Sequence, residues 1–198
     1  DALRRAMDSA GLEYFEATGE AAFYGPKADF LAKDVLGRDW QLSTIQVDFI
    51  QPARLGCTYV GEDGQEHVPV VLHRAVTGTT ERFLGVIIEH FAGAFPVWLS
   101  PVQAVLIPIA DRHVAYCRKV QEELQAAGLR VELDERPERM NAKIRDAQKQ
   151  KVPYMLVVGD QEQENHQVAL RLRSGENPGP MALEAFIERA RRDVAEGN

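Results

Sequence analysis

The stretch AVLIPIA, residues 104–110, and its counterpart PYMLVVGD, residues 153–160, decide the fold of the second half of the chain. Both are unbroken apolar runs, which is typical of strands buried on both faces of a sheet. Between them lie a helical pattern at 112–128 that ends at a glycine, a third strand pattern at 129–135 and a second helical pattern at 139–151. This alternation predicts a small α/β domain with three parallel strands.

The remainder of the second half completes the predicted domain. QVALRLR at 167–173 follows the preceding strand by a short connection, so we expect the two strands to pair antiparallel. Strand alternation puts Leu170 on one face and leaves Arg171 and Arg173 on the other. The pattern at 181–197 predicts a closing helix.

The first half of the chain has a different organisation. Its patterns predict a helix running into a strand at 2–17, strands at 30–36 and 40–49, a hairpin between 57–60 and 67–76, and a helix that begins at Thr79. GAFPVWLSP at 93–101 then interrupts the pattern with two prolines. We therefore expect two domains, residues 1–99 and residues 100–198.

Composition and charge restrict the class of protein. The chain is 45% hydrophobic and 27% charged, which is ordinary for a globular protein and argues against disorder. No apolar run approaches the roughly 18 residues of a membrane helix. Cys57 and Cys117 lie far apart, so we expect neither a disulfide scaffold nor a cysteine zinc cage, and a reduced, cytosolic setting fits.

The formal net charge of −7 argues against a protein that binds nucleic acid, but one stretch of the chain carries a local excess of positive charge. Residues 136–151 carry six cations and only two acidic side chains, Glu138 and Asp146. The cations are Arg136, Arg139, Lys143, Arg145, Lys149 and Lys151. Such a cluster indicates either a surface for a polyanion or an ordinary solvated helix face, and the charges alone leave both open.

Three features of the first half are unusual for purely structural residues. Arg82 falls in the first turn of a predicted helix, where the helix dipole disfavours a cation, so an anion or an aromatic base at the site would explain it. Thr44, Gln46 and Asp48 share one strand face, as in a hydrogen-bonding substrate floor or an open sheet face. His73 ends an apolar strand, where a histidine is more often structural than a metal ligand.

Several stretches resemble, in order along nearly the whole chain, bacterial-type threonyl-tRNA synthetases. They are AFYGPKADF (22–30), DWQLSTIQVDF (39–49), TYVGEDG (58–64), VPVVLHRAVTGTTERFLGVIIEHFAGAFPVWLSPVQ (68–103) and KIRDAQKQKVPYMLVVGDQE (143–162). GTTERF at 78–83 is similar to the third signature motif of class II synthetases. The resemblance implies an α/β (α+β) fold. Residues 1–99 would be part of the class II antiparallel catalytic sheet with its motif-3 helix, and 100–198 an anticodon-binding domain with a mixed sheet.

The resemblance also implies a function and partners. The function is ATP-dependent attachment of threonine to its tRNA by an enzyme that uses ATP with magnesium and acts as a homodimer. The chain opens on Asp1 and has no counterpart of the editing region or of the first two class II motifs. We therefore expect a fragment that is inactive by itself. Two alternatives remain: a synthetase of another specificity, such as prolyl or glycyl, and a synthetase-derived RNA-binding module without activity.

In the catalytic part, the resemblance gives roles to six residues. Arg82 corresponds to the arginine that packs against ATP, and Gln41 and Thr44 to positions that line the nucleotide. Gln46 corresponds to a residue beside threonine and the tRNA acceptor end. The residues beside the amino-acid pocket are Tyr24 and Lys27.

Two details qualify these roles. Simple alternation sends Gln41 to the face opposite Thr44 and Gln46, so a common site requires a bulge or a strand end near residues 42–43. The family often has Cys-Gly at these two positions, where this chain has Leu42-Ser43, so the Ser43 side chain could narrow the pocket.

His73 corresponds to the third protein ligand of the family's catalytic zinc, whose other two ligands would lie upstream. That ion binds the amino and hydroxyl groups of threonine, which explains the rejection of valine. In the second domain, Arg145, Glu162 and Arg171 correspond to residues that contact anticodon bases. Pro137 replaces a polar residue that contacts a base in some relatives.

Overall fold

The structure is a computed structural model that describes residues 1–198. The chain divides into two compact units, Asp1–His90 and Phe91–Asn198, which are described separately below. Nine residues separate this division from the predicted boundary after residue 99. Residues 91–99 belong with the second unit because hydrogen bonds hold them there: the Gln103 Nε2 donates to Val97 O at 2.8 Å. None of the helices has the length and apolar character needed to cross a membrane.

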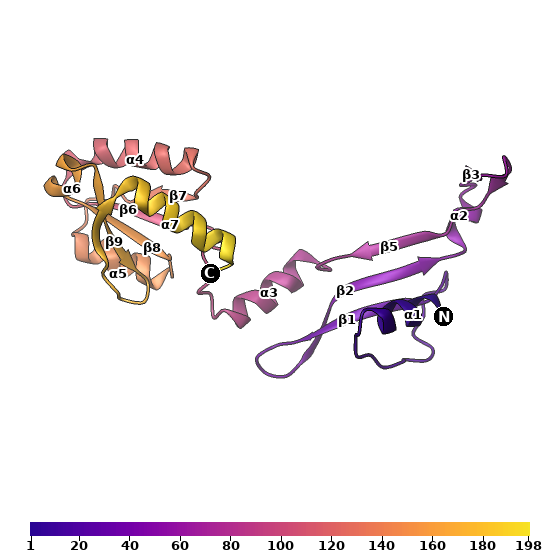
Figure 1. Cartoon of the computed structure of the whole chain (residues 1–198). Helices are drawn as coiled ribbons and strands as arrows, with labels where there is room; N and C mark the ends of the chain where they lie inside the picture. The colour runs from indigo at the N-terminus through magenta and orange to yellow at the C-terminus, as the bar shows by residue number, and fades with distance from the viewer. The chain divides into compact units, whose positions relative to one another are not determined.

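The first unit is built on a three-stranded antiparallel sheet in the order β1-β2-β5. Its strands are β1 (Lys27–Lys33), β2 (Asp39–Asp48) and β5 (Val71–Ala75). The other elements are α1 (Ala2–Ser9), α2 (Gln51–Arg54), the hairpin of β3 (Tyr59–Val60) with β4 (Glu66–His67), and α3 (Thr80–His90) (Figure 1).

Three predicted features of the first unit differ in the structure. Residues 10–26 form no strand beyond one bridge between Ala22 and Gly25, so the strand expected after the first helix is absent. The first strand ends at Lys33 because the Asp34 carboxylate accepts from the backbone N–H groups of Leu36 and Arg38 and closes a turn. The hairpin expected at 57–76 is reduced to two-residue strands.

Strand β2 contains a bulge, which is one of the two irregularities that would allow a common site for Gln41 and Thr44. Phe30 pairs with Ser43, but Leu31 pairs with Gln41, so Leu42 is an extra residue opposite β1. An extra residue shifts strand alternation by one position. Gln41 therefore faces the same side of the sheet as Thr44, and this prediction is confirmed.

The second unit is a five-stranded mixed sheet in the order β10-β9-β8-β6-β7. Its strands are β6 (Ala104–Pro108), β7 (Val131–Leu133), β8 (Tyr154–Val158), β9 (Gln167–Leu172) and β10 (Gly179–Ala182). As predicted, β6, β7 and β8 are parallel and β9 is antiparallel to β8. Strand β10 was not predicted, because its Gly-Pro start is a poor strand signal.

Helices cover both faces of this sheet (Figure 1). They are the 3₁₀ turn η1 (Asp111–His113), α4 (Val114–Ala126), α5 (Met140–Lys149), α6 (Asp160–Glu164) and α7 (Leu183–Glu196). Helices α4 and α7 pack on one face, where Leu106, Leu156 and Phe186 are fully buried. Helix α5 packs on the other face, where Ile144 meets Met155. The unit thus has a core on each side of its sheet.

Side chains of α4 form hydrogen bonds with the backbone of the edge strand β7. The side-chain amides of Gln121 and Gln125, on α4, both donate to the Val131 carbonyl, at 3.1 and 3.4 Å. Two side chains of one helix therefore bind a carbonyl of this short edge strand.

Candidate functional site

One face of the sheet in the first unit carries the polar side chains that the sequence analysis singled out. The pairing register and the bulge at Leu42 put them on the same side. We call this the polar face, and it consists of Tyr24, Lys27, Asp29, Gln41, Thr44, Gln46, Asp48 and His73. Six of these residues were predicted to bind nucleotide, threonine or zinc.

Hydrogen bonds connect the residues of the polar face. Asp29 accepts from the Lys27 ammonium at 2.6 Å and from the Gln41 amide at 2.7 Å. The Tyr24 hydroxyl donates to the Gln46 amide oxygen. The hydrogen bond to Asp29 also raises the pKa of Lys27, so the Lys27 ammonium stays protonated at neutral pH. Asp29, to which the sequence analysis gave no role, therefore connects two predicted binding residues.

Arg82 reaches this sheet at the bulge. Its Nη1 donates to the Gln41 carbonyl at 2.9 Å, and the rest of its side chain is exposed. The turn before α3 lies close to the same place, because a Cβ on Gly78 would lie 2.5 Å from the Leu42 carbonyl oxygen. Gly78 also has φ +67°, a conformation that favours glycine. The bulge and this glycine together bring Arg82 next to Gln41.

His73 is paired with a buried carboxylate. Its Nε2 lies 2.9 Å from Asp48 Oδ2, and the Asp48 side chain is 1% exposed. Burial by itself would raise the pKa of Asp48, but the hydrogen bonds from His73 and from the Gln51 and Ile50 backbone N–H groups hold that pKa below its ordinary value. The ionised Asp48 therefore orients the His73 ring and leaves Nδ1 as the nitrogen without a hydrogen bond.

A carboxylate behind a histidine is the arrangement that fixes a metal-binding imidazole in many zinc sites. No group of three or more His, Cys, Asp or Glu side chains gathers within residues 1–198. His73 with Asp48 thus fits one ligand of a zinc site, and the remaining ligands would have to come from elsewhere.

Ser43 does not face the predicted pocket. Its hydroxyl donates to the Ala75 carbonyl at 2.9 Å and accepts from the Arg74 guanidinium. Register places it opposite Phe30, on the reverse side from Thr44. The serine therefore leaves the polar face unchanged, contrary to the narrowing that the sequence suggested.

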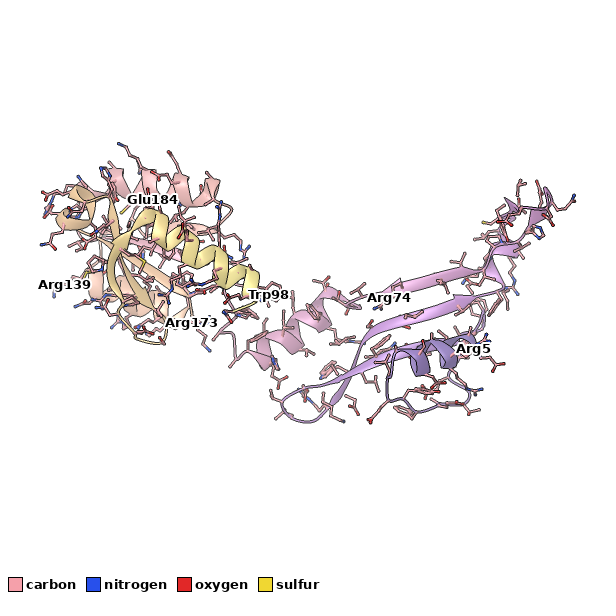
Figure 2. The ribbon with its side chains drawn as sticks, in the orientation of Figure 1. Arg5, Arg74, Trp98, Arg139, Arg173 and Glu184 are labelled. Carbon is pink, nitrogen blue, oxygen red and sulfur yellow. The ribbon has the colours of Figure 1, made fainter.

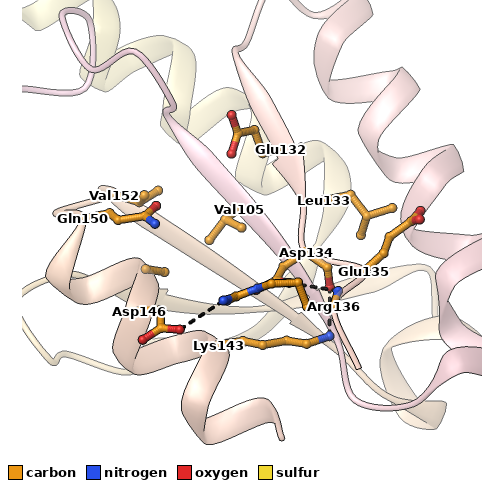
Figure 3. Close-up of a pocket in the computed structure, with 11 residues that line it drawn as sticks. Val105, Glu132, Leu133, Asp134, Glu135, Arg136, Lys143, Asp146, Gln150 and Val152 are labelled. Atoms are coloured by element: carbon orange, nitrogen blue, oxygen red, sulfur yellow. Dashed lines mark hydrogen bonds and ion pairs between the residues drawn. The ribbon is translucent and has the colours of Figure 1, made fainter. Parts of the chain in front are cut away.

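In the second unit, the structure separates the six cations of residues 136–151 into two groups. Lys143 is buried and donates to the Asp134 carbonyl, and Arg136 binds the Asp134 and Asp146 carboxylates (Figure 3). Lys151 donates to the carbonyl of Ala92. The exposed cations whose charge is uncompensated or nearly so are Arg139 (labelled in Figure 2), Arg145 and Lys149. The surface available to a polyanion is thus smaller than the sequence indicated.

The three residues predicted to contact the anticodon have different environments. Arg145 is exposed on α5. Arg171, half-buried on β9, pairs in register with Met155, on the sheet face that α5 covers. Glu162 is buried, and its Oε2 accepts the Gly159 backbone N–H at 2.9 Å, which caps α6. No hydrogen bond or ion pair joins these three residues to one another.

Two cavities lie beside α5. The larger, about 340 Å³, is bounded by β6, β7 and α5, with Val105, Asp134 and Lys143 among its lining residues (Figure 3). The smaller, about 260 Å³, lies at the carboxyl ends of β6 and β7, and Pro137 and Ala110 are in its wall. Carboxyl ends of parallel strands are where ligands commonly bind in open α/β sheets. The smaller cavity is therefore the better candidate for a binding site.

Family comparisons agree with this division of the chain. Residues 2–91 match the tRNA synthetase class II core domain (G, H, P, S and T), and residues 103–193 match the anticodon binding domain. Together the two families account for most of the chain.

Individual proteins give a more specific result. The chain is 66% identical to the threonine–tRNA ligase of Rubrobacter xylanophilus and 56% identical to that of Thermus thermophilus, over 98% of its own length in each case. It spans about 30% of the length of these relatives. A crystal structure of the RNA binding domain of threonyl-tRNA synthetase from Cryptosporidium parvum covers 96% of the chain at 37% identity with a TM-score of 0.87, and the chain covers 48% of that protein. The chain therefore belongs to the threonyl-tRNA synthetase family, in which it corresponds to the end of the class II core domain and the anticodon-binding domain.

Proposed function

We propose that this chain supplies one wall of the catalytic site and the anticodon-binding domain of a threonine–tRNA ligase. The bulge at Leu42 is the observation that carries the catalytic part. It turns Gln41 onto the same face as Thr44 and Gln46, beside the carbonyl that holds Arg82. A row of amide, hydroxyl and guanidinium groups on one rigid sheet suits a ligand with many polar atoms, such as a nucleotide.

Arg82, Gln41 and Thr44 are the proposed ATP-binding residues. The guanidinium of Arg82 is held at one nitrogen and exposed elsewhere, so its plane is available to stack on the base or to donate to phosphate. Asp29 orients the side-chain amide of Gln41 by accepting from its Nε2. The side-chain oxygen of Gln41 is then left to accept a hydrogen bond from a ligand. ATP would be used with magnesium, as the family resemblance implies.

Tyr24, Lys27 and Gln46 are the proposed residues around threonine, with Gln46 also close to the tRNA acceptor end. His73 would hold the zinc ion through Nδ1, with Asp48 behind it. When bound, this ion would supply a Lewis-acid site for the amino and hydroxyl groups of threonine. The chain's own contribution is to fix the His73 ring, with Nε2 turned toward Asp48 and Nδ1 left for the ion.

The second unit would bind the anticodon loop of threonine tRNA through Arg145, Glu162 and Arg171. Arginine and glutamate side chains can donate to and accept from base edges, whereas Lys149 would touch only phosphate. A homodimeric parent enzyme is part of the same proposal.

The test of the catalytic part uses a full-length synthetase that contains these residues. Thr44→Val should lower kcat/KM for ATP in threonine-dependent pyrophosphate exchange by about 10- to 100-fold, because a hydroxyl proposed to bind the nucleotide is lost. Ser43→Ala is the matched control, since Ser43 is the adjacent residue on the opposite face. Equal kinetics for the two variants would contradict the proposed nucleotide site.

The zinc assignment has its own measurement. His73→Ala in the full-length protein should remove stoichiometric zinc, as measured by metal analysis, because a catalytic zinc site needs three protein ligands. One tightly bound zinc per subunit in that variant would mean that His73 is not a ligand.

The anticodon assignment can be tested on the 198-residue chain. Arg171→Ala should weaken binding to a stem-loop with a threonine anticodon by roughly 1–3 kcal/mol and have little effect on a stem-loop with another anticodon. Lys149→Ala should weaken both and reduce the salt slope by about one. If Arg171→Ala weakened both stem-loops equally, Arg171 would not read the sequence.

A further inference from the structure

A cluster outside the predicted site residues connects two loops at the carboxyl ends of β6 and β8. Asp160 Oδ1 accepts from Arg112 Nε at 2.9 Å and from His113 Nε2 at 2.9 Å, and Asp160 Oδ2 accepts from Arg112 Nη2 at 2.7 Å. The hydrogen bonds from Arg112 and His113 hold the pKa of Asp160 well below its ordinary value. Asp160 is thus an ionised acceptor for three N–H groups.

The hydrogen bonds of His113 determine its tautomer. The ring is 1% exposed, and its Nδ1 lies 3.2 Å from the backbone nitrogen of Ala110. A backbone N–H can only donate, so Nδ1 accepts and the ring proton is on Nε2, where it points at Asp160. His113 therefore joins the main chain of one loop to the carboxylate of the other.

These two loops carry Glu162, the proposed anticodon contact, and part of the wall of the smaller cavity. Ala110 lines the cavity of about 260 Å³, together with Pro137 and Lys143. Asp160 is the first residue of α6, and Glu162 follows two residues later with its carboxylate fixed on Gly159. A backbone hydrogen bond from Ile109 N to Val158 O, at 2.9 Å, joins the same loops at their base.

We propose that Arg112, His113 and Asp160 form a positioning cluster that fixes Glu162 relative to the wall of the smaller cavity. By doing so, the cluster increases the discrimination between anticodon sequences. The inference rests on the proposed role of Glu162 as an anticodon contact. None of the three residues needs to touch RNA, because Asp160 is the first residue of the five-residue helix α6 and lies two residues before Glu162.

The experiment measures the affinity of the full 198-residue chain for two anticodon stem-loops that share one stem, one with a threonine anticodon and one with another. The ratio of the two dissociation constants is the readout, because a loss of folded protein lowers both affinities and leaves the ratio unchanged. Asp160→Asn should reduce the ratio by about tenfold, as for a displaced base contact. Glu162→Gln should reduce it as well, and adding Asp160→Asn to Glu162→Gln should reduce it no further.

A second variant covers the case in which Asp160→Asn fails to fold. Arg112 is an exposed side chain, and Arg112→Ala removes two of the three hydrogen bonds to Asp160 without opening a cavity. Its matched control is Arg191→Ala, an exposed arginine that connects α7 to the Ala127 carbonyl. Arg112→Ala should reduce the ratio, and Arg191→Ala should leave it unchanged.

The outcomes separate the two proposals. An unchanged ratio in Arg112→Ala and in folded Asp160→Asn, with a reduced ratio in Glu162→Gln, would overturn the positioning cluster and keep the anticodon assignment. An unchanged ratio in Glu162→Gln would overturn the anticodon role of Glu162 itself.

Discussion

The two units of the chain are organised by different forces. In the second unit, apolar side chains fill both faces of a five-stranded sheet, and Leu106, Leu156 and Phe186 have no exposed surface. In the first unit, Val47 is the one buried Val, Leu or Ile side chain, and the sheet carries a row of hydrogen-bonded polar groups. Packing therefore dictates the second unit, whereas a bulge, a glycine turn and side-chain hydrogen bonds dictate the geometry of the first.

The largest expected difference between the units is functional. A polypeptide of these 198 residues should bind anticodon RNA through its second unit but show no threonine-dependent pyrophosphate exchange. The family resemblance implies that an arginine of the second class II motif grips the α-phosphate. These 198 residues contain no counterpart of that motif, and such positioning contributes several kcal/mol to catalysis. Exchange above background in a purified sample would contradict this prediction.

Core substitutions should show the next largest contrast. Phe186→Ala removes a fully buried ring and should lower the free energy of unfolding of the second unit by about 3–5 kcal/mol. Leu72→Ala, on an exposed side chain of β5, should change stability by less than about 0.5 kcal/mol. Urea unfolding, monitored by amide hydrogen exchange in each unit, would measure the stability change of both variants. Similar losses for the two variants would mean that the first unit also depends on packing.

Gly78 tests whether backbone geometry governs the first unit. Gly78→Ala places a methyl group against the Leu42 carbonyl in a left-handed conformation, so the turn before α3 should shift at a cost of about 1–3 kcal/mol. Amide exchange should become faster around the bulge. Gly85→Ala is the control, since the added Cβ would meet nothing within 4 Å. If both variants behaved alike, the close approach at Gly78 would be unimportant.

The smallest predicted effect concerns pH. Because Arg112 and His113 lower the pKa of Asp160 in the folded chain, the ionised carboxylate stabilises the second unit above the unfolded pKa of about 4. This contribution is lost as pH falls through the lower, folded pKa. The stability difference between the wild type and Asp160→Asn should therefore be largest near neutral pH and decrease below about pH 4. A difference that stayed constant down to pH 2 would contradict the assigned pKa shift.

The same contrast explains what the sequence could predict. Buried strands such as β6 and β8 were identified because continuous apolar runs depend on composition alone. An irregularity near Leu42, either a bulge or a strand end, was predictable because the family resemblance puts Gln41, Thr44 and Gln46 in one site. The role of Glu162 as a helix cap and the burial of Lys143 could not be predicted. Glu162 accepts from the Gly159 N–H and Lys143 donates to the Asp134 carbonyl, and only the fold brings these backbone groups near.

The two glutamines on the edge strand β7 have a consequence for the behaviour of the protein at high concentration. A free strand edge is a template on which another chain can extend the sheet, and this is a common first step of aggregation. Gln121 and Gln125 already occupy the carbonyl of Val131, and the strand is only three residues long. An incoming strand would find few vacant backbone partners, so two uncharged side-chain amides make this edge resist intermolecular sheet growth.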